Sequence, residues 1–311
     1  MDAIRTLDQL VSQLRGAPAR RVVVAAGNDE DTLQAAERAV TAGIASVTLV
    51  GDPRRIASAC GKLGVEPRSF TVIDEPDDSA AGAKARDLVR RGEADVLMKG
   101  LIGTEKFMRL ILDKEKGLLS QGQVLSHLAV LEIPAYQQSH GKLLFVADVA
   151  IVPAPDVDTK VKILEYCVAA AHAFGIERPR VAMVAASEKV SGKMPSTADA
   201  AVIAKMAERG QIKGAIVDGP LALDVALSPR ACEIKGLRSS VDGSADVLIF
   251  PNIESGNVFY KAATLLAGAR LAAAVVGTSA PCVLTSRADS DESKFMSIAL
   301  GCRLAGERTA R

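Results

Sequence analysis

Short apolar runs alternate with helical patterns through the first third of the chain. Residues 29–42 and 53–63 predict helices, because acidic residues or a proline stand at their starts and a glycine follows their ends. Buried strands are predicted by apolar runs at residues 21–26, 46–50, 69–73 and 94–98. Since strands of this kind are covered on both faces, the pattern predicts a mainly parallel sheet between two layers of helices.

The alternation breaks in the middle of the chain. Residues 128–133 and 143–152 are apolar runs with no helical pattern between them, which predicts an antiparallel strand pair and the start of a second domain. The alternation then resumes and predicts helices at residues 156–174, 195–209, 255–266 and 289–304. The fold class predicted by the whole pattern is α/β.

The composition fits a two-domain globular protein, since the chain has 311 residues and 49% of them are hydrophobic. Lys and Arg number 38 against 37 Asp and Glu, so no basic excess indicates a nucleic-acid partner. Five widely spaced cysteines without a CxxC pair favour a reducing, cytoplasmic compartment. No membrane association is expected, because the sequence shows no signal-peptide pattern and no apolar run of membrane-spanning length.

Several common catalytic motifs do not occur in the sequence. No GxGxxG follows the first strand, and Asp29 and Glu30 put negative charge where a dinucleotide pyrophosphate would bind. No P-loop, GxSxG or HExxH occurs, and no metal-ligand spacing relates His127, His140 and His172. The sequence therefore predicts no metal site.

The strongest candidate for chemistry is the pair Ser286-Arg287, which follows a predicted strand at residues 282–284. Ligands bind at the carboxyl ends of strands in open α/β folds, and a planar guanidinium suits a phosphate group. A structural interpretation applies to the residues that follow. Asp289 would cap the last helix with Glu292 as its capping-box partner, and Asp291 would complement the helix dipole.

Weaker candidates lie at strand ends and helix starts. Lys99 follows a predicted strand. Asp218 stands before a predicted sharp turn at Gly219-Pro220, and a purely structural role in this turn explains the residue equally well. Asn257 and Lys261 follow a glycine that would let a ligand approach the backbone, although a helix-start turn explains them as well. Arg109 lies on a predicted helix, where a lone arginine usually faces solvent.

Four blocks in order resemble one family. They are KMPSTADAA at residues 193–201, RGQIKG and DGPLALD within residues 209–224, Gly-Asn and Tyr-Lys within residues 256–261, and SRAD at residues 286–289. Residues 99–101 and 125–127 extend the match upstream. On these blocks the chain is similar to the phosphate acetyl/butyryltransferases, and closer to the butyryl branch, over roughly residues 90–304.

The resemblance implies an isocitrate/isopropylmalate dehydrogenase-like fold of two α/β domains with an interdomain cleft. The first domain would comprise residues 1–128 and 286–311, and the second residues 129–285. The implied reaction is reversible transfer of a short acyl group, from acetyl to butyryl, between CoA and inorganic phosphate. CoA is a substrate in this reaction, so no metal or redox cofactor is implied. A homodimer or larger homo-oligomer is expected on the same ground.

The resemblance also assigns roles to individual residues. Arg287 and Arg109 would hold the phosphoryl group, and Ser286 would donate a hydrogen bond near the reacting sulfur or carbonyl. The acetyl branch is expected to carry an acidic residue six positions after this arginine, where this chain has Ser293. The base therefore stays open between Asp291, a neighbouring group and solvent. The other substrate-binding residues would be Lys99, Asp218, Asn257 and Lys261.

Two functions of other classes remain open at this point. A non-catalytic protein that binds CoA or acyl phosphate is compatible with Ser293 at the position of the expected acid. An NAD-dependent decarboxylating dehydrogenase would use a similar two-domain fold. The length of the acyl group also stays open, because a pocket discriminates one methylene by only about 1–3 kcal/mol.

Overall fold

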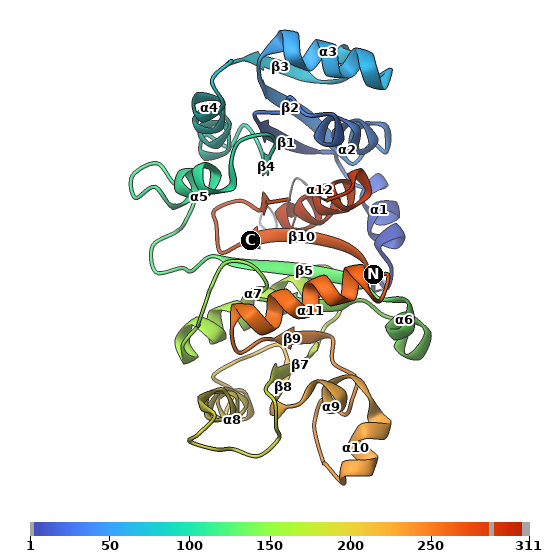
Figure 1. Ribbon diagram of the computed structural model, residues 1–311, viewed down its shortest axis with the longest axis vertical. Coiled ribbons are helices and arrows are strands. Elements are labelled where there is room, and N and C mark those ends of the chain that lie inside the picture. Colours follow the sequence, from blue (N-terminus) through green and yellow to red (C-terminus); the bar gives the residue numbers. More distant parts are fainter. Residues whose placement is uncertain (1–2, 286–288, 307–311) are drawn as a thin grey trace. The chain divides into compact units, whose positions relative to one another are not determined.

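The computed structural model describes residues 3–285 and 289–306, and the chain divides into two compact units. We term residues 7–125 and 271–311 the terminal unit, and residues 1–6 and 126–270 the central unit. Each unit contains strands that are mainly parallel and connected by helices (Figure 1). The α/β class predicted from the sequence is thus confirmed. The predicted division at residues 128 and 286 stays a prediction.

The terminal unit holds the strands β1 (Arg20–Ala25), β2 (Ala45–Gly51), β3 (Thr71–Asp74), β4 (Val96–Lys99), β10 (Arg270–Val276) and β11 (Cys282–Val283). They follow the order β3-β2-β1-β4-β11-β10. Neighbouring strands are parallel except β10 and β11, which run antiparallel. The apolar run of β1 lies centrally, with Val22 paired to Val47 on one side and to Val96 on the other. Its burial on both faces explains why the run is continuous rather than alternating.

The helices of the terminal unit are α1 (Leu7–Arg15), α2 (Glu30–Thr41), α3 (Pro53–Leu63), α4 (Asp78–Arg90), α5 (Thr104–Leu112), α12 (Asp291–Gly306) and the short 3-10 helix η1 (Pro67–Ser69). Aspartates cap three of them: the side chains of Asp29, Asp52 and Asp77 accept hydrogen bonds from first-turn backbone N–H groups. Figure 1 shows α4 on one side of the strands, and α2 beside α12 on the other. The layers predicted from the sequence are therefore present in this unit.

The strand order places a topological switch point at β1. The chain moves from β1 outward to β2 and β3, and then returns to the opposite side of β1 with β4. The carboxyl ends of β1 and β4 approach closely, since a Cβ atom on Gly100 would lie 2.3 Å from the carbonyl oxygen of Ala26. In open α/β sheets, ligands bind in the crevice outside the carboxyl ends of the strands at such a point.

The central unit holds the strands β5 (Ser126–Glu132), β6 (Leu144–Ala147), β7 (Arg180–Val184), β8 (Ile216–Leu221) and β9 (Val247–Ile249). They follow the order β5-β6-β9-β7-β8. Only β5 and β6 are antiparallel among the described pairs of this unit, which confirms the antiparallel pair predicted at the mid-chain break.

The connection between β5 and β6 differs from the prediction. It contains the helix α6 (Pro134–His140), where the sequence analysis predicted a loop. The helix begins with a proline at its first position and ends at Gly141, which has the left-handed conformation (φ 62°) of a C-cap. Its seven residues are too few to show a helical hydrophobic period, so only the end signals mark it.

The remaining helices of the central unit are α7 (Val157–Ala173), α8 (Pro195–Glu208), α9 (Leu223–Leu227), α10 (Pro229–Lys235) and α11 (Ile253–Leu265). Among the described residues of the chain, no helix combines the length and the apolar character needed to cross a membrane.

The predicted turn at Gly219-Pro220 is wrong. The strand β8 continues through both residues to Leu221, with a register irregularity between Ala182 and Val184 of β7. The end position of β8 in the strand order accounts for this, because a proline without an N–H group is tolerated at an edge or an irregularity.

Candidate active site

A pocket of about 150 Å³ lies at the switch point of the terminal unit. It is lined by Asp29, Asp31, Thr32, Lys99, Gly100, Leu101, Thr285 and Lys294. These residues come from the N-cap and first turn of α2, which follows β1, from the carboxyl ends of β4 and β11, and from α12. The pocket therefore occupies the place where the strand topology predicts a ligand.

Lys99 is the last residue of β4 and is buried, with 4% of its surface exposed. Its Nζ donates a hydrogen bond to the carbonyl oxygen of Gly100 at 3.1 Å. A buried ammonium group keeps its charge only at a cost unless an anion or several acceptors compensate it. Lys99, predicted as a substrate-binding residue, thus contributes a buried ammonium group to the pocket.

Lys294 brings a second buried ammonium group to the same pocket. It is 3% exposed, and its Nζ lies 3.1 Å from Oδ2 of Asp31. The side chain of Asp31 is 56% exposed, so the carboxylate is accessible while the lysine behind it is not. Neither Lys294 nor Asp31 was predicted as a site residue from the sequence. A lysine followed by Phe295 and Met296 in the last helix was the available signal, since a charge within an apolar stretch requires a partner.

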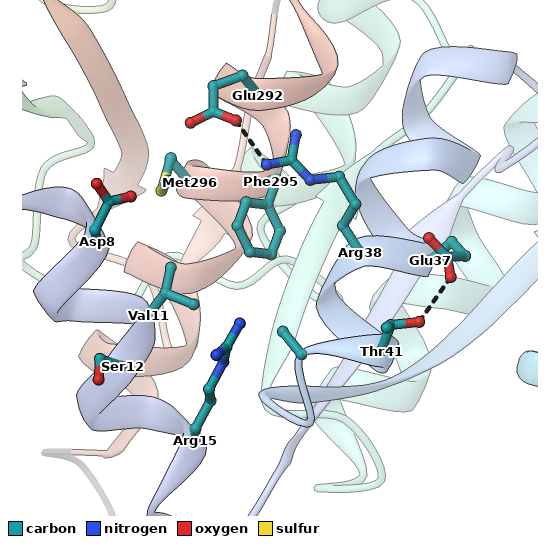
Figure 2. A pocket seen from close by; sticks show the side chains of 11 residues that line it. Asp8, Val11, Ser12, Arg15, Glu37, Arg38, Thr41, Glu292, Phe295 and Met296 are labelled. Atoms are coloured by element: carbon teal, nitrogen blue, oxygen red, sulfur yellow. Dashed lines mark hydrogen bonds and ion pairs between the residues drawn. The ribbon is translucent and has the colours of Figure 1, made fainter.

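The start of α12 is fixed to α2 by Arg38, which also lines a larger pocket between α1, α2 and α12 (Figure 2). Its Nη1 lies 2.8 Å from Oδ2 of Asp291, and its Nη2 lies 2.6 Å from Oε2 of Glu292. Its guanidinium carbon stands 4.4 Å from the ring centre of Phe295. The carboxylate of Asp291, predicted as the nearest candidate base, is therefore part of an ion pair.

The capping role predicted for Asp289 is wrong. The hydroxyl of Ser290 accepts the backbone N–H of Ser293 at 3.2 Å, which is the cap of α12. Glu292, the predicted capping-box partner, pairs with Arg38 instead. The neutral hydroxyl of Ser290 lies one residue nearer to the helix and satisfies this donor without a third carboxylate beside Asp291 and Glu292.

Ser286 and Arg287 lie outside the described residues. Thr285, the residue before them, is buried and lines the switch-point pocket. Arg109 lies on α5, is 77% exposed at its side chain and pairs with Glu105 one turn earlier. Its predicted role in holding the phosphoryl group stays a prediction.

In the central unit, Asp218 is bound within its own surroundings. Its Oδ2 accepts hydrogen bonds from the hydroxyl of Ser239 at 2.7 Å and from the backbone N–H of Ser240 at 3.1 Å. Asp224 lies inside α9 rather than at its cap and pairs with Lys235. These contacts give both carboxylates a structural role, whether or not a substrate also reaches them.

Asn257 belongs to a second cluster of the central unit. Its side-chain amide donates to the carbonyl oxygen of Val149 at 2.9 Å, next to Asp148. The buried carboxylate of Asp148 accepts the hydroxyl of Ser126 at 2.9 Å and the backbone N–H of His127 at 2.8 Å. This network joins the start of β5, the loop after β6 and the first turns of α11, so it rigidifies the segment that carries Asn257. Lys261 is exposed on the same helix.

The comparisons with known proteins agree with this architecture over nearly the whole chain. The family model described as phosphate acetyl/butaryl transferase matches residues 5–87 and 80–302. A phosphate butyryltransferase of Clostridium acetobutylicum is 45% identical over 305 residues, which are 98% of this chain and 100% of the relative. A phosphate acetyltransferase of Thermotoga maritima is 42% identical over 96% of this chain and 99% of its own.

Among solved structures, a branched-chain phosphotransacylase from Enterococcus faecalis superimposes with a TM-score of 0.81 at 31% identity, covering 92% of this chain and 99% of its own. The four sequence blocks and these full-length matches lead to the same result. The chain belongs to the phosphate acetyl/butyryltransferase family.

Proposed function

We propose that the protein is a phosphate acyltransferase that moves a short acyl group, from acetyl to butyryl, reversibly between CoA and inorganic phosphate. The observation that carries this proposal is the switch-point pocket, where Lys99 and Lys294 bring two buried ammonium groups next to Thr285. The full-length relatives named as phosphate butyryl- and acetyltransferases support the transferase over a binding protein or a dehydrogenase.

The chemistry of the transfer explains why the pocket contains buried ammonium groups. In one direction the CoA thiolate attacks the carbonyl carbon of the acyl phosphate, and the phosphate leaves as an anion. Fixed cations stabilise the charge that develops on the leaving group, because they need no reorganisation at the moment of reaction. Lys99 supplies one such cation from the end of β4. By family resemblance, Arg287 and Arg109 would hold the phosphoryl group, and Ser286 would bond near the reacting atoms.

Three further features belong to the proposal. An isocitrate/isopropylmalate dehydrogenase-like cleft for the substrates and a homodimer or larger assembly rest on the family resemblance, and a cytoplasmic location rests on the five widely spaced cysteines. The roles predicted for Asp218, Asn257 and Lys261 in substrate binding have the same basis. No metal or redox cofactor enters the reaction as proposed, since CoA is itself a substrate in one direction and a product in the other.

The test is CoA release from acetyl-, propionyl- and butyryl-CoA, with and without inorganic phosphate, followed by a thiol reagent. Phosphate-dependent release is expected, and the rate ratio among the three thioesters gives the acyl preference. Release without phosphate would instead indicate a thioesterase. No release, together with CoA binding in calorimetry, would indicate the binding protein.

Arg287→Ala is the matching variant. It is expected to lose about 10²–10³-fold in kcat, the range observed when one charge-stabilising donor is removed. Arg68→Ala serves as the control, because Arg68 is 86% exposed at its side chain on η1. Near-normal activity of Arg287→Ala would contradict the assignment of this arginine.

A further inference from the structure

The reaction proposed above needs an acceptor for the CoA thiol proton, and the position where the family resemblance predicts an acid holds Ser293. A thiol has an ordinary pKa of about 8.5, so a basic group near it raises the thiolate fraction at neutral pH. The switch-point pocket contains a carboxylate from a different element. It belongs to Asp31, in the first turn of α2.

Several carboxylates lie near this end of the terminal unit, and their contacts separate them. Asp29 caps α2 by accepting the backbone N–H of Thr32 at 3.0 Å. Asp291 and Glu292 pair with Arg38, and neither lines the switch-point pocket. Asp29 and Asp31 both line that pocket, but Oδ2 of Asp29 is buried, whereas Asp31 keeps more than half of its side chain exposed. Asp31 is therefore the more accessible of the two carboxylates in the pocket.

The ammonium group of Lys294 forms an ion pair with one oxygen of the Asp31 carboxylate. This ammonium group is buried and lies 3.1 Å from Oδ2, which leaves the other carboxylate oxygen, Oδ1, for a substrate. A fixed neighbouring cation restricts the orientation of a carboxylate. The contact joins residues 263 positions apart, and Lys294 lies one position after Ser293. The last helix thus supplies a cation that orients an acid of another helix, where the resemblance predicts an acid of its own.

We propose that Asp31 is the catalytic base of the transfer and that Lys294 is its positioning residue. This inference rests on the proposed transferase activity. In the direction of thioester formation, Asp31 accepts the proton of the CoA thiol as the sulfur forms its bond to the acyl carbon. The bond from the acyl carbon to the phosphate oxygen breaks, and its electron pair stays with the phosphate. Asp31 then gives the proton to the phosphate, so that acyl-CoA and hydrogen phosphate are formed and the carboxylate is restored.

The experiment measures acyl-CoA formation from butyryl phosphate and CoA by thioester absorbance. Asp31→Asn is expected to lower kcat by about 10²–10⁴-fold, the usual contribution of a general base. The KM values for both substrates are expected to change little, since the side chain retains its size. For Asp31→Ala, added formate is expected to restore part of the rate, because a small carboxylate can occupy the vacated space.

Glu30→Gln is the matched control. Glu30 is the neighbouring carboxylate, pairs with Lys62 at 2.8 Å and does not line the switch-point pocket. The kcat of the Glu30→Gln variant is therefore expected to equal that of the wild type. Lys294→Met is expected to lower kcat, and Lys294→Arg to recover part of the loss. Lys142→Met controls for the loss of a buried ion pair, because Lys142 pairs with Asp246 at 2.7 Å in the central unit. It is expected to lose stability while keeping its kcat.

The possible results separate cleanly. A wild-type rate in Asp31→Asn would overturn the inference while leaving the transferase activity intact. The inference would also be overturned if formate does not restore the lowered rate of the Asp31→Ala variant and every Asp31 and Lys294 variant has a lowered Tm. These results would show that the ion pair is purely structural. Absence of phosphate-dependent acyl transfer in the wild type would be a failure of the proposed function itself.

Discussion

Arg38 holds Asp291 at the first position of α12, with Nη1 of the arginine 2.8 Å from Oδ2 of the aspartate. The same guanidinium binds Glu292 and lies over the ring of Phe295. Through these contacts one residue of α2 fixes the start of the helix that follows Ser286 and Arg287. The geometry indicates that Asp291 orients the helix, whereas its sequence position alone suggested chemistry.

Arg38→Met should separate these two roles of Asp291. The variant is expected to lose about 1–2 kcal/mol of unfolding free energy, from partly exposed ion pairs and one cation–π contact. If Asp291 acts by orienting the helix, Asp291→Asn and Arg38→Met should lower kcat by similar factors. Urea unfolding and steady-state rates check this. A much larger loss of kcat in Asp291→Asn would restore Asp291 as a candidate base.

Gly100 should tolerate no side chain. An added Cβ would lie 2.3 Å from the carbonyl oxygen of Ala26. This is a backbone atom, so it cannot move away by a rotamer change as a flexible side chain could. Gly100→Ala is expected to cost about 1–3 kcal/mol, the usual range for overpacking, and to lower activity because the residue lines the switch-point pocket. Thermal unfolding and CoA-release rates measure both effects.

Gly61→Ala is the matched substitution. Gly61 lies inside α3, and nothing stands within 4 Å of its added Cβ. Alanine favours a helix interior, so this variant is expected to gain about 0.5–1 kcal/mol. Equal effects of the two substitutions would contradict the close approach of β4 to β1.

The sequence was sufficient to predict the elements whose signals are local. The run at residues 21–26 became β1 (Arg20–Ala25), because continuous burial leaves continuous apolar residues. The antiparallel pair β5 and β6 followed from a missing helical period, but the seven residues of α6 were too short to show one.

The candidate site was less accessible to prediction. Lys99 was identified, since it directly follows the strand predicted at residues 94–98, and it is the last residue of β4. Asp31 and Lys294 were missed, because their contact joins residues 263 positions apart and depends on how α12 packs against α2. The cap at Ser290 shows the same limit at short range, since several neighbouring side chains could satisfy one backbone donor.

The stability of the protein should decrease as the pH falls, and Asp95 should account for part of this decrease. The side chain of Arg21 holds the pKa of Asp95 below its usual value, against the opposing effect of burial, and the backbone N–H of Arg21 helps at 2.8 Å. A carboxyl with a lowered folded-state pKa stabilises the protein above its unfolded pKa, about 3.9, and loses that contribution as the pH falls through the folded value.

Asp95→Asn is therefore expected to cost about 1–3 kcal/mol at pH 7, as for hydrogen bonds to charged groups. The difference between wild type and variant should shrink as the pH falls below about 4, where the carboxyl of the unfolded state becomes protonated first and that of the folded state at lower pH. Urea unfolding across this range provides the test, with Glu66→Gln on the exposed η1 turn as control. A difference that stays constant with pH would mean that the charge of Asp95 contributes nothing.

The five cysteines should be silent toward thiol reagents in the folded protein. All of them are buried, and burial raises the pKa of the Cys302 thiol to about 12 and raises the pKa of Cys167 as well. The thiolate is the reactive form, so the native protein is expected to react slowly with a disulfide reagent, and the denatured protein to expose five thiols.

Cys232 is the thiol most dependent on a short element, because it lies on the seven-residue helix α10 and donates its S–H to the carbonyl oxygen of Val225. If one thiol of the native protein reacts rapidly and Cys232→Ser abolishes that reaction, α10 opens on the time scale of the assay. If none does, the thiol signal in CoA-release measurements comes from CoA alone.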